Sequence, residues 1–181
     1  MTDNRLENRS DKNSVQDLHR ILATYKAIAV VGLSADWFRP SFFAAKYMQE
    51  HGYKIIPVNP KHPEILGEVS YPSLKAIPAE IAGTIEMVDC FRKSEDILPI
   101  AQDAIAIGAK CLWQQLGVVN LAAHEAAVHA GLDSVFDRCV KIEHARVFGG
   151  LGWVGVNTKI ITAKKLSVSN LTIKTDGNHH G

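Results

Sequence analysis

The sequence predicts an α/β fold, in which a parallel sheet of about five strands is wound in both directions and helices cover its faces. Three observations support this prediction. Apolar runs typical of strands recur along the chain, at residues 27–33, 53–60, 84–91 and 109–115, and a short fifth strand is expected at 133–137. Helical segments alternate with these runs, which is the order of parallel βαβ units with right-handed crossovers. The first run also ends in a glycine turn, as Rossmann-like sheets do.

The first third of the chain contains two of these strands and two helices. Helical spacing of apolar residues over 15–25 predicts a short leading helix. The continuous, β-branched run at 27–33 is typical of a strand that is buried on both faces. Pro40 suits the first turn of the next helix, and Gly52 ends that helix before the second strand at 53–60.

A proline-rich stretch, residues 61–83, separates the second strand from the third and predicts at most short helical turns. The third strand at 84–91 is followed by a helix over 94–108, with Ser94 as its N-terminal cap and acidic residues in its first turn. Gly108 closes this helix.

The last part of the sheet consists of the fourth strand at 109–115, a helix over 120–131 and a short fifth strand at 133–137. After Arg138 the sequence becomes glycine-rich and then β-branched, which predicts a C-terminal arm. We therefore expect one Rossmann-like domain over residues 13–165, preceded by a disordered tail at 1–12 and followed by a flexible tail at 166–181.

Composition and charge exclude several classes of partner. The chain is 46% hydrophobic and 22% charged with a net charge of +1, so bulk charge gives no case for nucleic acid or an anionic membrane. No apolar run is long enough to span a membrane, and the polar N-terminus carries no secretory signal. Three cysteines, an odd and small number, favour a reducing compartment. We therefore expect a cytoplasmic protein.

The glycine turn and the end of the second strand together predict a phosphate-bearing ligand. Gly32 and Ser34 lie beyond the first strand, where doubly wound sheets bind ligands. The dinucleotide fingerprint would need a third glycine at Trp37 and an acidic residue after the second strand, where Lys61 stands instead. A lysine there favours a ribose phosphate, either the 2′-phosphate of NADP or the 3′-phosphate of coenzyme A. Arg39 is a candidate for the pyrophosphate, and ordinary surface charge remains the alternative for both cations.

Several motifs in combination resemble the small single-domain CoA-binding proteins, which are similar to the N-terminal CoA-binding domain of the succinyl-CoA synthetase alpha subunit. The motifs are VVGLS…RPS, IPVNPKH, YPSL, VDCFRKSED, AIGAKCLWQQLGVVN and DRCVKIEH, and the resemblance covers roughly residues 15–165. It implies coenzyme A as the ligand. The binding residues that it implies are Gly32, Leu33, Ser34, Arg39, Pro40, Ser41, Val58, Asn59, Pro60, Lys61, Phe91 and Arg92. The phosphorylated-histidine domain of the synthetase has no counterpart here, so its ligase chemistry is not implied.

The segment DRCVKIEH gathers Asp137, Cys139, Glu143 and His144 in sequence. Its spacing matches no zinc pattern, so we predict a polar loop after the fifth strand and no metal site. Cys139 falls on the same edge of the sheet as the glycine turn, where it can form a mixed disulfide with CoA under oxidising conditions or else be buried and inert. No set of nucleophile, base and orienting residue is recognisable, so we expect no catalytic residues.

The sequence leaves three functions open. The first is a non-catalytic module that binds CoA or an acyl-CoA, as a carrier or regulator of a protein partner that the sequence does not identify. The second is an NADP-dependent oxidoreductase, which the missing third glycine disfavours. The third is an interaction domain with a vestigial nucleotide site.

Overall fold

The computed structural model describes residues 14–149 and confirms the α/β fold with its five-stranded parallel sheet. The strand order is β2-β1-β5-β6-β7, and every neighbouring pair is parallel. All five predicted strands are confirmed, with the bounds β1 Ala27–Val31, β2 Lys54–Val58, β5 Met87–Cys90, β6 Cys111–Gln114 and β7 Asp133–Val135. From β1 the chain moves to β2 and then returns past β1 to β5. The strand order therefore reverses between β1 and β5, where sheets of this kind bind their ligands.

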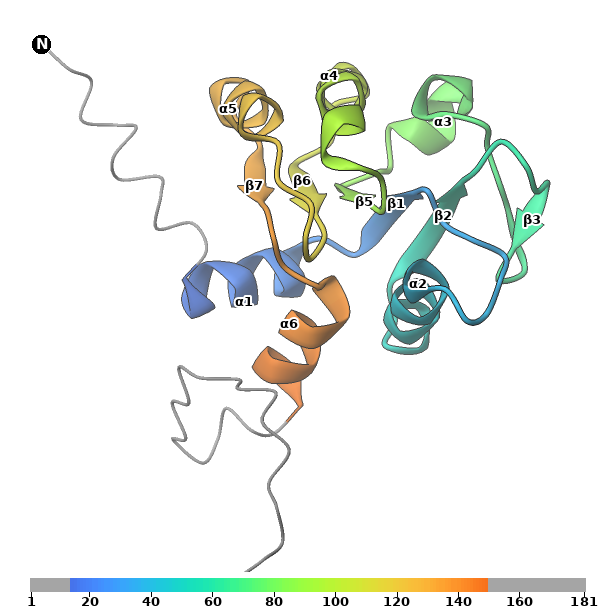
Figure 1. The fold of residues 1–181 in the computed structure, drawn as a ribbon, viewed down its shortest axis with the longest axis horizontal. Coiled ribbons are helices and arrows are strands. Elements are labelled where there is room, and N and C mark those ends of the chain that lie inside the picture. Colours follow the sequence, from blue (N-terminus) through green and yellow to red (C-terminus); the bar gives the residue numbers. More distant parts are fainter. Residues whose placement is uncertain (1–13, 150–181) are drawn as a thin grey trace, which may run out of the picture.

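The helices form a layer on each face of the sheet, as Figure 1 shows. On one face lie α3, α4 and α5, and on the other lie α1, α2 and α6. Their bounds are α1 Val15–Thr24, α2 Pro40–Glu50, α3 Ala79–Ala82, α4 Ile97–Ala106, α5 Leu121–His129 and α6 Val140–Phe148. Each layer has its own hydrophobic core, because alternate residues of a strand point to opposite faces. Ala29 packs toward α4 and α5, whereas its neighbour Ile28 packs toward α1 and α2.

The proline-rich stretch contains a hairpin that the sequence does not predict. Strand β3 (Glu64–Ile65) pairs with β4 (Glu68–Val69) in an antiparallel two-stranded sheet at the side of β2 (Figure 1). The 3₁₀ helix η2 (Leu74–Ala76) and the four-residue α3 follow, and these do agree with the predicted short helical turns.

The predicted start of the helix at Ser94 is wrong by one turn. Residues Ser94–Asp96 form a 3₁₀ helix, η3, and α4 begins at Ile97. The Ser94 hydroxyl does not cap α4, because its oxygen accepts a hydrogen bond of 3.0 Å from the backbone N–H of Val119. This residue instead ties the loop after β5 to the loop after β6.

The prediction of an arm and a polar loop after Arg138 is wrong over residues 140–148, because these residues form the helix α6. The predicted disordered tail at 1–12, the remainder of the arm after residue 149 and the predicted tail at 166–181 lie outside the described residues. Within residues 14–149, no helix combines the length and the apolar character that a membrane crossing requires.

Candidate functional site

A cleft of about 1130 Å³ opens at the carboxyl ends of the strands. The loops after β1, β2, β5 and β6 form its walls, together with the first residues of α2 and α6. Of the binding residues that the sequence predicts, the cleft is lined by Gly32, Ser34, Arg39, Pro40, Ser41, Val58, Asn59, Pro60, Lys61, Phe91 and Arg92. Leu33 is the exception, because its side chain is completely buried in the core beneath the turn. The structure therefore brings the predicted set together in one place.

Gly32 is the point at which the ends of three strands meet. Its N–H donates to the carbonyl of Val58 at 3.0 Å, and the N–H of Phe91 donates to the carbonyl of Val31 at 2.8 Å. Its φ is +86°, in the left-handed region that favours glycine. A Cβ at this position would lie 2.4 Å from the carbonyl oxygen of Phe91, so no other residue fits without moving the end of β5.

A pair of serines shapes the backbone that follows Gly32. The Ser34 N–H donates to the hydroxyl oxygen of Ser41 at 3.1 Å, and the Ser34 oxygen accepts from the N–H of Asp36 at 3.1 Å. These bonds fix the turn against the start of α2, whose first residue is Pro40 and whose N-terminus has no side-chain cap. An uncapped helix N-terminus beside a glycine turn is suited to bind phosphate.

Asn59 connects the end of β2 to the glycine turn. Its side-chain N–H donates to the carbonyl of Leu33 at 2.7 Å, and its side-chain oxygen accepts from the backbone N–H of Lys61 at 2.7 Å. Lys61 is thereby held on the rim of the cleft, where its side chain is exposed. Asn59 thus positions a cation beside the glycine turn.

The cations of this end of the cleft differ in how they are paired. Arg39 lies 3.8 Å from Asp36, and Arg92 donates to Asp96 at 2.9 Å. Lys61 makes no ion pair with any residue between 14 and 149. Lys61 is therefore the cation that can bind an anion without first giving up a carboxylate.

The opposite end of the cleft was not predicted, apart from Cys139. It is formed by the loop after β6 and the start of α6, which contribute Gln115, Leu116, Val118, Cys139 and Ile142. Three of these side chains are apolar and none carries a formal charge. The position of Gln115 directly after β6 was the available signal, since the carboxyl ends of parallel strands share one edge.

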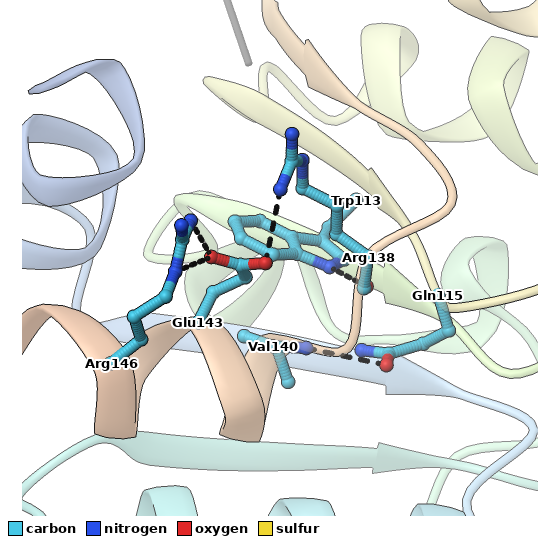
Figure 2. Close-up of polar contacts among 6 residues, drawn as sticks. All are labelled: Trp113, Gln115, Arg138, Val140, Glu143 and Arg146. Atoms are coloured by element: carbon cyan, nitrogen blue, oxygen red, sulfur yellow. Dashed lines mark hydrogen bonds and ion pairs between the residues drawn. The ribbon is translucent and has the colours of Figure 1, made fainter. Parts of the chain in front are cut away.

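Polar contacts fix the start of α6 against the sheet, as Figure 2 shows. The Trp113 indole donates to the carbonyl of Arg138 at 2.7 Å, and the Gln115 side-chain oxygen accepts from the N–H of Val140 at 3.3 Å (Figure 2). Glu143, which is buried, accepts from Arg138 and from Arg146 (Figure 2). The backbone on both sides of Cys139 is therefore anchored.

Gln115 also reaches a buried acid beneath the cleft. Its side-chain N–H donates to Asp89 on β5 at 2.6 Å. Asp89 is only 2% exposed, and burial raises the pKa of its carboxyl to about 7. A hydrogen-bonded path thus runs from the centre of the sheet through Gln115 to the start of α6.

The polar residues that are clustered in the DRCVKIEH segment have separate partners in the structure. Asp137 accepts from the N–H of Gly117 at 2.8 Å, and His144 lies 3.1 Å from the hydroxyl of Tyr47. Glu143 pairs with its two arginines. Between residues 14 and 149, no group of three or more His, Cys, Asp and Glu side chains is arranged to hold a metal ion.

Comparisons with known proteins reveal close relatives of the whole described domain. The uncharacterized protein YneT of Bacillus subtilis (strain 168) is 40% identical over 132 residues, which are 73% of this chain and 95% of YneT. A hypothetical protein from Pyrococcus horikoshii OT3 has a solved structure that matches with a TM-score of 0.70 and 41% identity, over 76% of this chain and 94% of that one.

A more distant match shares the fold alone. It is the dinucleotide-forming acetyl-coenzyme A synthetase 1 of Ca. Korarchaeum cryptofilum, with a TM-score of 0.54 and 23% identity, over 65% of this chain and 26% of that one. Among protein families, the sequence profile of the CoA binding domain matches residues 26–145, which contain every residue of the cleft.

Proposed function

The chain belongs to the CoA binding domain family, and on that premise we propose that its cleft binds coenzyme A or an acyl-CoA as a non-catalytic module. The observation that carries this proposal is the polarity of the cleft. Lys61 follows β2 at one edge of the sheet and Arg39 follows its neighbour β1, whereas the uncharged residues Gln115, Leu116 and Val118 follow β6, on the far side of β5. Coenzyme A has the same polarity, because its nucleotide carries all of its phosphates and its pantetheine arm is neutral.

The proposed orientation assigns a role to each part of the cleft. Residues 32–34, with residues 39–41, hold the pyrophosphate at the N-terminus of α2, which no side chain caps. Residues 58–61 hold the adenosine, and Lys61 contacts its 3′-phosphate. Residues 91 and 92 line the path of the adenine or of the pantetheine arm. The arm then extends toward Gln115 and Cys139.

A panel of nucleotides tests this function against the two alternatives. At a ligand concentration about 100 times Kd, binding stabilises the folded state by about 2.7 kcal/mol, which raises the Tm of a chain of this size by about 5–10 °C. We expect that rise with CoA and acetyl-CoA, and a smaller one with NADP, NAD and ATP. A larger rise with NADP would favour an oxidoreductase, and no rise with any of them would favour an interaction domain.

Lys61→Glu is expected to weaken CoA binding more than tenfold. A charge-assisted contact to phosphate contributes about 1.5–3 kcal/mol, and each 1.4 kcal/mol corresponds to about tenfold in Kd. The substitution removes that contact and adds repulsion. Titration calorimetry with CoA measures the change directly.

Lys54→Glu is the matched control for this measurement. Lys54 is an exposed residue at the other end of the same strand, β2. Its substitution by glutamate therefore changes the net charge by the same amount, but far from the cleft. We expect this variant to bind CoA as the wild type does. If both variants lose the same affinity, or if neither loses any, the assignment of Lys61 to the phosphate is wrong.

A further inference from the structure

We propose that Cys139 exchanges with disulfides of coenzyme A, so that the protein holds CoA as a mixed disulfide at the uncharged end of the cleft. This inference rests on the proposed function, and it extends that function from reversible binding to covalent, redox-dependent retention. Four features of the described residues support it.

The first feature is that Cys139 is the accessible thiol of the chain. All three cysteines of the sequence lie within residues 14–149, and Cys90 and Cys111 are completely buried. Burial also raises the pKa of both buried thiols well above the usual range, which keeps them protonated and unreactive. Cys139 is partly exposed and lines the cleft.

The second feature is the direction that the cleft imposes on its ligand. The phosphates are attracted to the end that carries Lys61, after β2, and Cys139 lines the cleft after β7, at the opposite edge of the sheet. A CoA molecule bound in this direction extends its pantetheine arm toward Leu116 and Ile142. The arm ends in a thiol, so the reactive sulfur of the ligand arrives where the reactive sulfur of the protein lies.

The third feature is that the cysteine backbone is fixed before any ligand binds. Arg138, on one side, accepts a hydrogen bond from the Trp113 indole, and Val140, on the other, donates to Gln115 (Figure 2). Gln115 is itself 4% exposed and is held by Asp89. The thiol is therefore presented from a rigid element, which favours reaction with a bound partner.

The fourth feature is that the Cys139 side chain has no structural task at the helix terminus. Cys139 occupies the N-cap position of α6, where Ser, Thr, Asp or Asn would ordinarily accept a hydrogen bond from the first turn. No such bond is made by its sulfur. Capping of α6 is provided instead by Gln115, which leaves the sulfur available to the cleft.

The exchange requires no oxidant other than the CoA disulfide itself. The thiolate of Cys139 attacks one sulfur of the disulfide, the bond between the two CoA sulfurs breaks, and a bond between Cys139 and one CoA forms. The second CoA leaves as a thiolate and takes up the proton that Cys139 has lost. Free thiols reverse the reaction, so the retained CoA is released when the surroundings become reducing.

Intact-mass analysis after incubation with CoA disulfide tests the inference. We expect the addition of one CoA, its removal by dithiothreitol, and its absence in Cys139→Ser. Glutathione disulfide, which lacks the nucleotide, should react at least about tenfold more slowly, because binding raises the local concentration of the CoA sulfur. Lys61→Glu should slow the reaction with CoA disulfide, whereas the control Lys54→Glu should react with it as the wild type does.

Three results would overturn the inference: no adduct, an adduct that peptide mapping of the wild type places on Cys90 or Cys111, or equal rates with the two disulfides. Peptide mapping needs no variant, so the test does not depend on how Cys139→Ser folds. Calorimetry with reduced CoA in dithiothreitol separates the two proposals. Binding without adduct formation removes the exchange alone, whereas no binding of reduced CoA removes the proposed function as well.

Discussion

Gly32→Ala is expected to abolish CoA binding and to lower the free energy of unfolding by about 2–5 kcal/mol. Two physical effects add up at this residue. An alanine at φ +86° is strained by about 1–2 kcal/mol, and its Cβ would lie 2.4 Å from the carbonyl oxygen of Phe91. This contact can be relieved only if the end of β5 moves. Phe91 and Arg92, which line the cleft directly after β5, would then be displaced. Urea unfolding and calorimetry measure the two consequences separately.

Gly52→Ala provides the control for backbone strain alone. Gly52 has nearly the same φ, +85°, but a Cβ there would have nothing within 4 Å. It also lies before β2, at the end of the sheet away from the cleft. We expect a loss of about 1–2 kcal/mol and unchanged CoA affinity. Equal losses in the two variants, with CoA binding retained by both, would show that the close approach at Gly32 does not matter.

Asp89→Asn is expected to stabilise the protein at pH 8 by as much as about 4 kcal/mol and to have little effect at pH 4. Burial raises the pKa of the folded carboxyl from 3.8 to about 7, so the unfolded carboxyl ionises at lower pH than the folded one. Between these values the wild type loses about 1.4 kcal/mol of stability per pH unit, and above pH 7 the loss is complete. Asparagine keeps an acceptor for Gln115 and never ionises.

The pH dependence of Asp89→Asn is measured as the difference from the wild type in urea unfolding at pH 4, 6 and 8. The buried neighbours Cys90 and Cys111 stay neutral over this range, because their own pKa values are raised. Glu125→Gln, at an exposed position on α5, is the control for the removal of one carboxyl group. If Asp89→Asn destabilises the protein equally at all three values, the carboxyl is ionised in the folded state and the account of its burial is wrong.

Four of the five strands, β1, β2, β5 and β6, could be predicted because each contains an apolar run that turn residues bound, whereas the short β7 followed from the alternation of helices and strands. The sheet is buried on both faces, so its strands need no alternation of polar and apolar residues and appear as continuous runs. The cationic end of the cleft followed from the same reasoning. Once β1 and β2 are placed as parallel neighbours, Gly32 and Lys61 must emerge at the same edge.

Helix α6 could not be predicted because polar residues occupy its buried face. Glu143 and His144 are each only 7% exposed. Glu143 accepts hydrogen bonds from Arg138 and Arg146, and His144 lies beside Tyr47, which is far away in the sequence. Periodicity of apolar residues therefore fails as a signal here. The uncharged end of the cleft was missed for the same reason, since Ile142 reaches the cleft only when α6 is a helix.

The hairpin of β3 and β4 was missed because its turn uses an unexpected residue. Leu66 adopts φ +58° and Gly67 φ +77°, a turn in which the first position is ordinarily Asn, Asp or Gly. Two-residue strands around a leucine give no alternation to detect. Tertiary contacts of this segment, such as that of Ser70 with the carbonyl of Asn59, are what hold it against β2.

Whether the cleft binds CoA through its 3′-phosphate is measured by calorimetric titration of the wild-type protein with CoA and with dephospho-CoA, under reducing conditions. We expect one CoA to bind per chain, and dephospho-CoA, which lacks only the 3′-phosphate, to bind more than about tenfold more weakly because Lys61 loses its partner. Equal affinity for the two ligands, or no binding of CoA at all, would contradict it.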